Sequence, residues 1–441
     1  MTRVTRWMAG LATAAATLGT APRLRAQAST APDSLTLAAL QAEAVQRDPR
    51  GRQLALLASQ SALRERTIAA GHLPTSGASA QGQYQSQVAT LPFSLPGGIG
   101  APVPPHATYD AHVEAREALF DASLGRRRDV ERAQLAQSQA QVGASLHALR
   151  QAVNDAFFAA LQLQAQGEEL AAGLTDLEAQ LRVVAARVRQ GAALPGDSAI
   201  LAAELLRRRQ SLAELAANRD AALEVLSSLT GHPIASARLL ALPDLGDEVA
   251  RARETSGTTR ARPEYELFAR SRDLLAAQRA AASARDLPRV AAFGRAGYGR
   301  PGLNPFARDF TSYWLGGILV EWTPWNWGTT ARDREVLALQ QQVVSTEETA
   351  FRESIDRATV RDLATIDRLG RASGEDDTII ALREQVLHET ALRFSEGVVT
   401  SAEYVDRQTD LLAARLARVS HRVELAQARA RYLTTLGVEV R

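Results

Sequence analysis

The chain has 441 residues, 23% of them charged, and its 51 basic side chains against 49 acidic ones leave a formal net charge of +2. Every Lys-or-Arg position is an arginine, so the isoelectric point of about 9.2 reflects arginine chemistry and not a basic field for nucleic acid. The absence of cysteine excludes disulfides, thiolate metal sites and a lipidated N-terminal cysteine, and the absence of lysine excludes a P-loop and Schiff-base chemistry.

Residues 1–28 have the pattern of a secretory signal peptide. Two early arginines precede an apolar run from Trp7 to Leu18, and Ala26 and Ala28 form an A-x-A cleavage pattern. We expect cleavage near Ala28, because the apolar run is too short to cross about 30 Å of hydrocarbon as a helix. No comparable apolar run follows, so a membrane crossing by this chain would not use an apolar helix.

Residues 29–231 are predicted to form the first of two similar units. A short helix and a longer one, divided at Asp48-Pro49, precede a strand hairpin at about 75–119. In the second strand, side chains of opposite character alternate: Tyr109, Ala111, Val113 and Ala115 with Asp110, His112, Glu114 and Arg116. A sheet face with four ionisable groups must be wet, since burying them without partners is costly.

A helical hairpin at about 124–229 completes the first unit. Its first helix is roughly 100 Å long at 1.5 Å per residue, longer than most globular cores are wide. The segment Gly191–Gly196 breaks the helical pattern, and a second helix returns antiparallel to the first. Residues 232–262, which are rich in turn-forming residues, are predicted to be the connector to the second unit.

Residues 263–437 repeat the same order, with a strand hairpin at about 288–322 and a helical hairpin at about 329–436. Arg187–Gly231 aligns without a gap with Arg393–Gly437, including identical arginines and glycines at both ends. Three further landmarks have the same spacing in both units: Pro49, Pro74 and Tyr84 match Pro263, Pro288 and Tyr298. The chain is therefore predicted to be one mostly α-helical unit written twice.

No group of residues in the sequence indicates catalysis, a cofactor or a metal. Gly297–Gly302 fits G-x-G-x-x-G, but Pro301 and Pro305 stand where a phosphate-binding helix would begin. The histidines are scattered, without H-E-x-x-H spacing. We expect no enzyme activity, no cofactor and no metal site.

The tryptophans outside the signal peptide gather in one stretch, beside the apolar strand GILVEW: Trp314, Trp322, Trp325 and Trp327. Tryptophan concentrates where a membrane meets water, so this stretch is predicted to be a membrane interface. Four strands cannot close a membrane barrel, for which about eight is the natural minimum. Three chains would supply twelve.

In this order of elements the sequence resembles the TolC-type outer-membrane channel family, over essentially the whole mature chain. The resemblance implies a mixed, mostly α fold in which a homotrimer forms a twelve-stranded barrel in outer-membrane lipid. A long periplasmic α-helical barrel would continue it. It further implies two partners, a periplasmic adaptor protein and an inner-membrane transporter, and no nucleic acid.

The resemblance also assigns roles to two turns. In the family, the turn between the longest helix and the return helix forms a periplasmic tip where the adaptor docks. This role falls on residues in both units: Arg187, Gly191, Leu194 and Asp197, and Arg393, Gly397 and Thr400. Acidic residues that line the narrow periplasmic entrance in some members match Glu403 and Asp406. The first unit has Asp197 but Ile200 at these places.

The leading hypothesis is a passive exit duct of a tripartite efflux pump, located in the outer membrane with a long periplasmic extension. One alternative within the same family is a type I protein secretion channel. Another, of a different class, is a soluble periplasmic coiled-coil scaffold in which the strand hairpins pack as small sheets. The sequence does not distinguish drug, metal ion or protein as the transported substrate.

Overall fold

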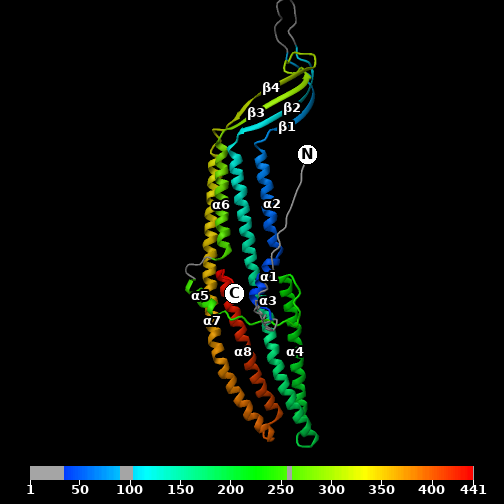
Figure 1. Ribbon diagram of the computed structural model, residues 1–441, viewed down its shortest axis with the longest axis vertical. Coiled ribbons are helices and arrows are strands. Elements are labelled where there is room, and N and C mark those ends of the chain that lie inside the picture. The colour runs from blue at the N-terminus through cyan, green and yellow to red at the C-terminus, as the bar shows by residue number, and fades with distance from the viewer. Residues whose placement is uncertain (1–33, 90–102, 256–260, 441) are drawn as a thin grey trace, which may run out of the picture.

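The computed structural model describes residues 34–89, 103–255 and 261–440, and the chain forms one elongated molecule (Figure 1). A β-sheet lies at one end and two helical hairpins end in turns at the other. The predicted signal peptide, residues 1–28, lies outside the described residues, as does part of the loop of the first strand hairpin.

The first unit contains six elements in the predicted order: α1 (Leu37–Arg47), α2 (Pro49–Ala70), β1 (Thr75–Tyr84), β2 (Ala107–Phe120), α3 (Ala122–Arg189) and α4 (Pro195–Thr230). Asp48 both ends α1 and begins α2. Its backbone N–H donates to the carbonyl of Ala44, and its carboxylate accepts from the N–H of Arg50 at 2.8 Å. Pro49 occupies the first helical position, where no N–H is needed.

The second unit repeats this order from α6 (Pro263–Ser283), which is extended by a short 3-10 turn, η1 (Ala284–Asp286). The other elements are β3 (Arg289–Arg300), β4 (Thr311–Glu321), α7 (Thr329–Ser395) and α8 (Ser401–Leu436). The mostly α fold of two tandem units, predicted from the sequence, is confirmed.

The connector contains an element that the sequence analysis did not predict, the helix α5 (Gly246–Thr255). Val249 and Ala252 of α5 are buried in the main hydrophobic core, and α5 packs on α8. This helix has only ten residues, which is too short for its apolar positions to show a clear helical period. The prolines and turn residues around it therefore led to the prediction of a connector without a helix.

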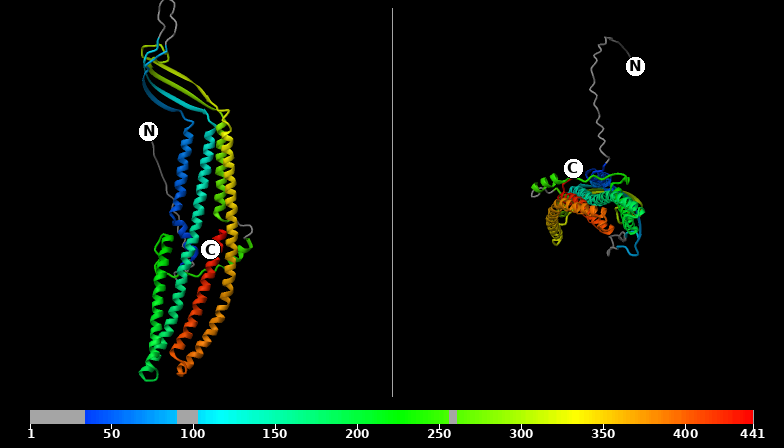
Figure 2. Two further views of the ribbon diagram at one scale, coloured as in Figure 1. Left: turned by 180° about the vertical axis from the view of Figure 1, so that it is seen from behind. Right: turned by 90° about the horizontal axis from the view of Figure 1, so that it is seen from below.

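The helices form a single curved layer. The long helices α3 and α7 run nearly the full length, packed with α2 and α6 near the sheet and with α4 and α8 farther away (Figures 1 and 2). Seen along the long axis, the layer is an arc, and α1 and the connector lie on its convex side (Figure 2). Among the helices of the described ranges, none combines the length and apolar composition that a membrane span requires.

The sheet is antiparallel, in the order β1-β2-β3-β4. Directly paired residues lie on the same face, so the register sorts the side chains into two faces. Trp314 pairs with Ala296, which pairs with Val113, which pairs with Ala78. This face is small and apolar. The opposite face carries Asp110, His112, Glu114 and Arg116 of β2 together with Arg295 and Glu321, whereas Glu117 pairs with Ala292 on the first face.

A buried polar network crosses the core at the middle of the molecule, where α1, α3 and α8 meet. Asn154 donates to Thr434 Oγ1 at 2.9 Å and accepts from Gln41 at 2.5 Å. His147, only 5% exposed, is 3.0 Å through Nε2 from the carbonyl of Thr434, so Nε2 carries the proton that it donates. These bonds satisfy polar groups that burial would otherwise penalise.

We predict that His147 makes the fold sensitive to mild acid. Burial lowers the pKa of this imidazole below its usual 6.5, and the nearby Arg262 lowers it further. The unfolded chain therefore binds the proton at a higher pH than the folded one, so stability falls as pH drops below about 6.5. In the variant His147→Gln, the midpoint of thermal unfolding should change less with pH between about pH 6.5 and 5 than in the unaltered chain. Circular dichroism measures this midpoint.

The exposed His72 supplies the control for this experiment. His72→Gln should retain the acid dependence of the unaltered chain. If the unfolding midpoint of His147→Gln falls with pH as steeply as that of the unaltered protein, the prediction is contradicted.

Candidate functional site

The two turns at the far end of the helical hairpins have the same backbone geometry. Gly191 has φ +74°, and the N–H groups of Gly191 and Ala192 donate to the carbonyls of Val188 and Arg187 at 3.0 and 2.8 Å. This is a Schellman cap, which needs a left-handed residue that glycine adopts without strain. Arg187 and Gly191 therefore define how α3 ends.

The second turn repeats the cap. Gly397 has φ +78°, and the N–H groups of Gly397 and Val398 donate to the carbonyls of Phe394 and Arg393 at 3.1 and 2.9 Å. The identical arginines and glycines that linked the two units in sequence thus occupy equivalent cap positions. Leu194 of the first turn is 73% exposed, and Arg393 and Gly397 are exposed in the second.

The helices that follow the turns begin differently. Asp197 reaches back to accept from the N–H of Leu194 at 3.2 Å, whereas in the second turn Thr400 Oγ1 accepts from the N–H of Glu403 at 3.3 Å. This bond is the hydroxyl half of a capping box, for which Thr400 and Glu403 have the required spacing. A carboxylate in the first helical turn also interacts favourably with the helix dipole.

The two turns are bonded to one another. Ser401, which is fully buried, donates to Asp197 Oδ1 at 2.7 Å, and Arg187 donates to the carbonyl of Ser395 at 3.1 Å. Beneath these bonds Phe394 and Tyr404 stack with ring centroids 5.2 Å apart. Sequence reasoning identified Arg187 and Asp197 but missed Ser401 and Ser395, because nothing local shows which residues meet across two units.

Glu403 and Asp406 lie one turn apart on the exposed side of α8. Within the described ranges no arginine or histidine lies at ion-pair distance from either carboxylate. The next acidic residue along this helix, Asp410, is neutralised by Arg383 at 3.0 Å and Arg407 at 3.2 Å. The two predicted entrance residues are therefore carboxylates without an ion-pair partner among the described residues.

The apolar face of the sheet ends in tryptophan on both sides. Trp314 and Trp322 lie on this face of β4 and its extension, about 26 Å apart at 3.3 Å per residue, with Ile318 and Val320 between them. Tilted by about 40° from the membrane normal, this stretch would span about 20 Å, somewhat less than the apolar band of about 25 Å in membrane barrels. All four predicted interface tryptophans are at least 60% exposed, and Trp325 and Trp327 contact each other edge to face.

The opposite face is held by ion pairs between strands. Glu114 pairs with Arg295 at 3.0 Å, and Arg116 pairs with Glu321 at 3.3 Å. Asp110 accepts from Tyr313 Oη and from His112 Nδ1, and His112 Nε2 is 2.8 Å from Ser79 Oγ. Sequence alternation showed that this face is wet, but its partners on β3 and β4 required the register.

The sheet has two open edges. In the described chain, β1 pairs only with β2 and β4 pairs only with β3. Each outer strand therefore presents backbone N–H and C=O groups to one side without a partner strand. In hydrocarbon such unpaired edges would be costly, because no water is present to bond their backbone groups.

The fold matches solved structures over nearly its whole length. The outer membrane protein VceC of Vibrio cholerae has 15% sequence identity and a TM-score of 0.65, with 92% of this chain and 97% of that chain covered. For the outer-membrane channel MtrE of Neisseria gonorrhoeae the identity is 20%, the TM-score 0.64 and the coverage 92% and 89%.

CusC, a protein that forms a transmembrane channel, has 15% sequence identity and a TM-score of 0.67, with 91% of this chain and 92% of that chain covered. No protein-family model matches the sequence, and a search of curated proteins finds no match. The likeness lies in the fold, because identities this low preserve architecture far better than individual residues.

We predict that a new charge is harmful on one face of β4 and tolerated on the other. Ile318 lies on the apolar face and its neighbour Leu319 on the polar one. Arginine on the lipid side of a membrane strand costs about 2–4 kcal/mol at mid-depth. Ile318→Arg should therefore sharply reduce the folded, membrane-extracted protein, measured after expression and membrane fractionation.

Leu319→Arg is the matched control, since it places the same charge one residue away on the polar face. It should leave the amount of folded membrane protein close to that of the unaltered chain. Similar losses in both variants would contradict the assignment of the faces.

Proposed function

We propose that this chain, which has the fold of the TolC-type outer-membrane channels, is the outer-membrane exit duct of a tripartite efflux pump. The observation that carries the proposal is the sheet, which has one apolar face flanked by tryptophans, one charged face and two open edges. Three copies would close it into twelve strands with lipid outside and water within.

The helical layer supports a continuous duct. The strands lead directly into α3 and α7, so a closed sheet would continue as a ring of helices, three curved layers in all. The arc of each layer, with α1 and the connector on its convex side, suits such a ring (Figure 2). The concave side would then line the passage.

The tips suit a docking role for a periplasmic adaptor, through which an inner-membrane transporter would deliver substrate. Leu194, Arg393 and Gly397 are exposed at the extreme end of the molecule, while Arg187 and Asp197 hold the two turns together. Exposed groups on a rigid, cross-bonded support make a surface that a partner can bind with little loss of conformational entropy.

The decisive experiment measures assembly and conductance together. The purified full chain should crosslink to trimers in detergent and conduct ions after reconstitution into planar bilayers. A stable monomer without conductance would overturn the proposal. Recovery of the native protein in the soluble periplasmic extract would instead favour the scaffold alternative.

We further predict that Glu403 and Asp406 control the periplasmic entrance. Threefold repetition would place their charges in two acidic rings, which repel one another and attract cations. The double variant Glu403→Ala, Asp406→Ala should raise the calcium concentration for half-maximal block of conductance, by roughly tenfold if two charge-assisted contacts are lost.

The control for this measurement is Asp410→Ala, which removes a carboxylate already neutralised by Arg383 and Arg407. Its calcium block should remain near that of the unaltered channel. An unchanged block in the double variant would refute the entrance assignment.

A further inference from the structure

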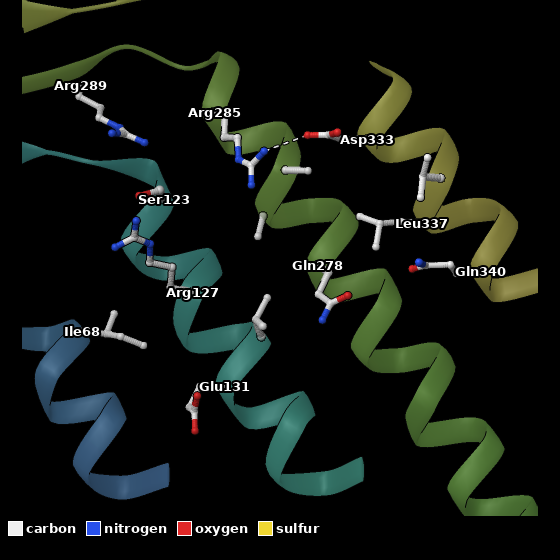
Figure 3. A pocket seen from close by; sticks show the side chains of 14 residues that line it. Ile68, Ser123, Arg127, Glu131, Gln278, Arg285, Arg289, Asp333, Leu337 and Gln340 are labelled. Carbon is white, nitrogen blue, oxygen red and sulfur yellow. Dashed lines mark hydrogen bonds and ion pairs between the residues drawn. The ribbon is translucent and has the colours of Figure 1, made fainter. Parts of the chain in front are cut away.

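A pocket of about 680 Å³ lies between α2, α3, α6 and α7, immediately below the sheet (Figure 3). Three arginines line it: Arg127 from α3, Arg285 from η1 and Arg289 from β3. None of the sites described above includes this pocket, and its walls come from within one chain.

One lining residue of the pocket, Arg289, belongs to the charged face of the sheet. Arg289 pairs in register with Glu321, whose side chain bonds Arg116 on that face, and its guanidinium reaches toward Asp121 at the start of α3. Since the apolar face is the one suited to lipid, Arg289 and the pocket beside it belong to the inner, water-filled side.

The charges in the pocket are unevenly compensated. Arg285 is paired with Asp333 at 2.9 Å, so this side is neutral. Arg289 has only a long contact of 3.8 Å to Asp121, and no carboxylate of the described residues lies at ion-pair distance from Arg127. Arg127 and Arg289 lie on either side of Ser123 (Figure 3). Glu131, the other carboxylate of the lining, bonds Arg64 at 3.5 Å, so the lining carries three arginines against two carboxylates.

Ser123 gives an independent sign of a missing ligand. The residue is only 7% exposed and lines the pocket, and its Oγ makes no hydrogen bond of normal geometry within the described ranges. A buried hydroxyl without a partner is costly, and native proteins rarely leave one unsatisfied. The carboxylate of Asp121 caps α3 by accepting from the N–H of Ser123 at 2.8 Å, so it lies beside this hydroxyl.

The remaining wall is apolar, formed by side chains of three helices: Ile68, Val130, Val336 and Leu337. Guanidinium groups bind phosphate and related oxyanions through charge-assisted hydrogen bonds, and the apolar wall would cover a hydrocarbon or aromatic body. We propose that this pocket binds an anionic amphiphile, with its oxyanion between Arg127, Arg289 and Ser123 Oγ and its apolar body against the helices.

This inference rests on the proposed function and deepens it. A trimer would contain three such pockets, which would bind anionic amphiphiles inside the duct just before the barrel. The binding itself does not depend on conduction. A binding measurement can therefore fail or succeed independently of the channel proposal.

The test uses 1-naphthyl phosphate, a small aromatic phosphate monoester, titrated by calorimetry into the full chain in phosphatidylcholine nanodiscs. The unaltered protein should bind it, and neutral 1-naphthol should bind at least about tenfold more weakly. Arg127→Gln, at an exposed side chain with no structural ion pair, should weaken binding about tenfold, and Ser123→Ala by several-fold.

Arg126→Gln is the matched control. Arg126 carries the same charge one residue away, pairs with Asp129 at 3.5 Å and does not line the pocket. It should bind the probe like the unaltered protein. Equal weakening in the Arg126 and Arg127 variants, or undiminished binding in the Arg127 variant, would overturn the proposed site.

A second arm distinguishes a solute from a membrane lipid, which could offer the same phosphate chemistry. Adding phosphatidylglycerol to the nanodiscs should leave the affinity for 1-naphthyl phosphate unchanged, because Arg289 belongs to the charged face of the sheet and not to the apolar face suited to lipid. Competition by phosphatidylglycerol would identify a headgroup site and overturn the solute assignment. Probe binding without conductance would reject the channel while leaving the pocket intact.

Discussion

The structure depends on one constraint, that backbone hydrogen-bonding groups at a strand edge must find partners when the strand lies in hydrocarbon. This chain has four strands, and the two outer ones are paired on one side only. A single copy therefore cannot satisfy its own sheet in a membrane. The apolar face, with Trp314 and Trp322 at its ends, is exposed, so the core of the described chain does not cover it.

Hydrogen bonds around Asp286 connect the sheet to the helices. Asp286 at the end of η1 accepts from Thr330 Oγ1 at 2.8 Å and from Asn326 Nδ2 at 3.0 Å, and its carbonyl accepts from Trp322 Nε1 at 3.0 Å. These bonds fasten the start of β3 to the turn between β4 and α7. Gly328, with φ +74°, allows the sharp change of direction that the joint requires.

The doubled chain gives near-symmetric architecture with different chemistry in each half. The two tip turns share the same glycine cap, yet Asp197 bonds Ser401 across the units while its counterpart Glu403 remains free to face solvent. Ile200 stands where the second unit has Asp406. Symmetry is set by backbone requirements, which both units must meet, whereas the side chains that are not needed for the turn can diverge.

The sequence by itself determined the order and length of the main elements, the position of both tips and the two-faced character of β2. These follow from local patterns, since a proline, a glycine cap or a period of two acts on its own neighbours. The likeness to TolC-type channels, first indicated by this order, is confirmed at the level of the fold.

Only the tertiary structure decided which groups meet. The bond between Asp197 and Ser401, the ion pairs across the sheet, the helix α5 and the pocket around Ser123 all join residues far apart in the chain or too few to form a pattern. Their contact depends on strand register and on how long helices cross. Local sequence patterns determine neither the strand register nor the crossing of the helices, because both depend on how the complete chain packs.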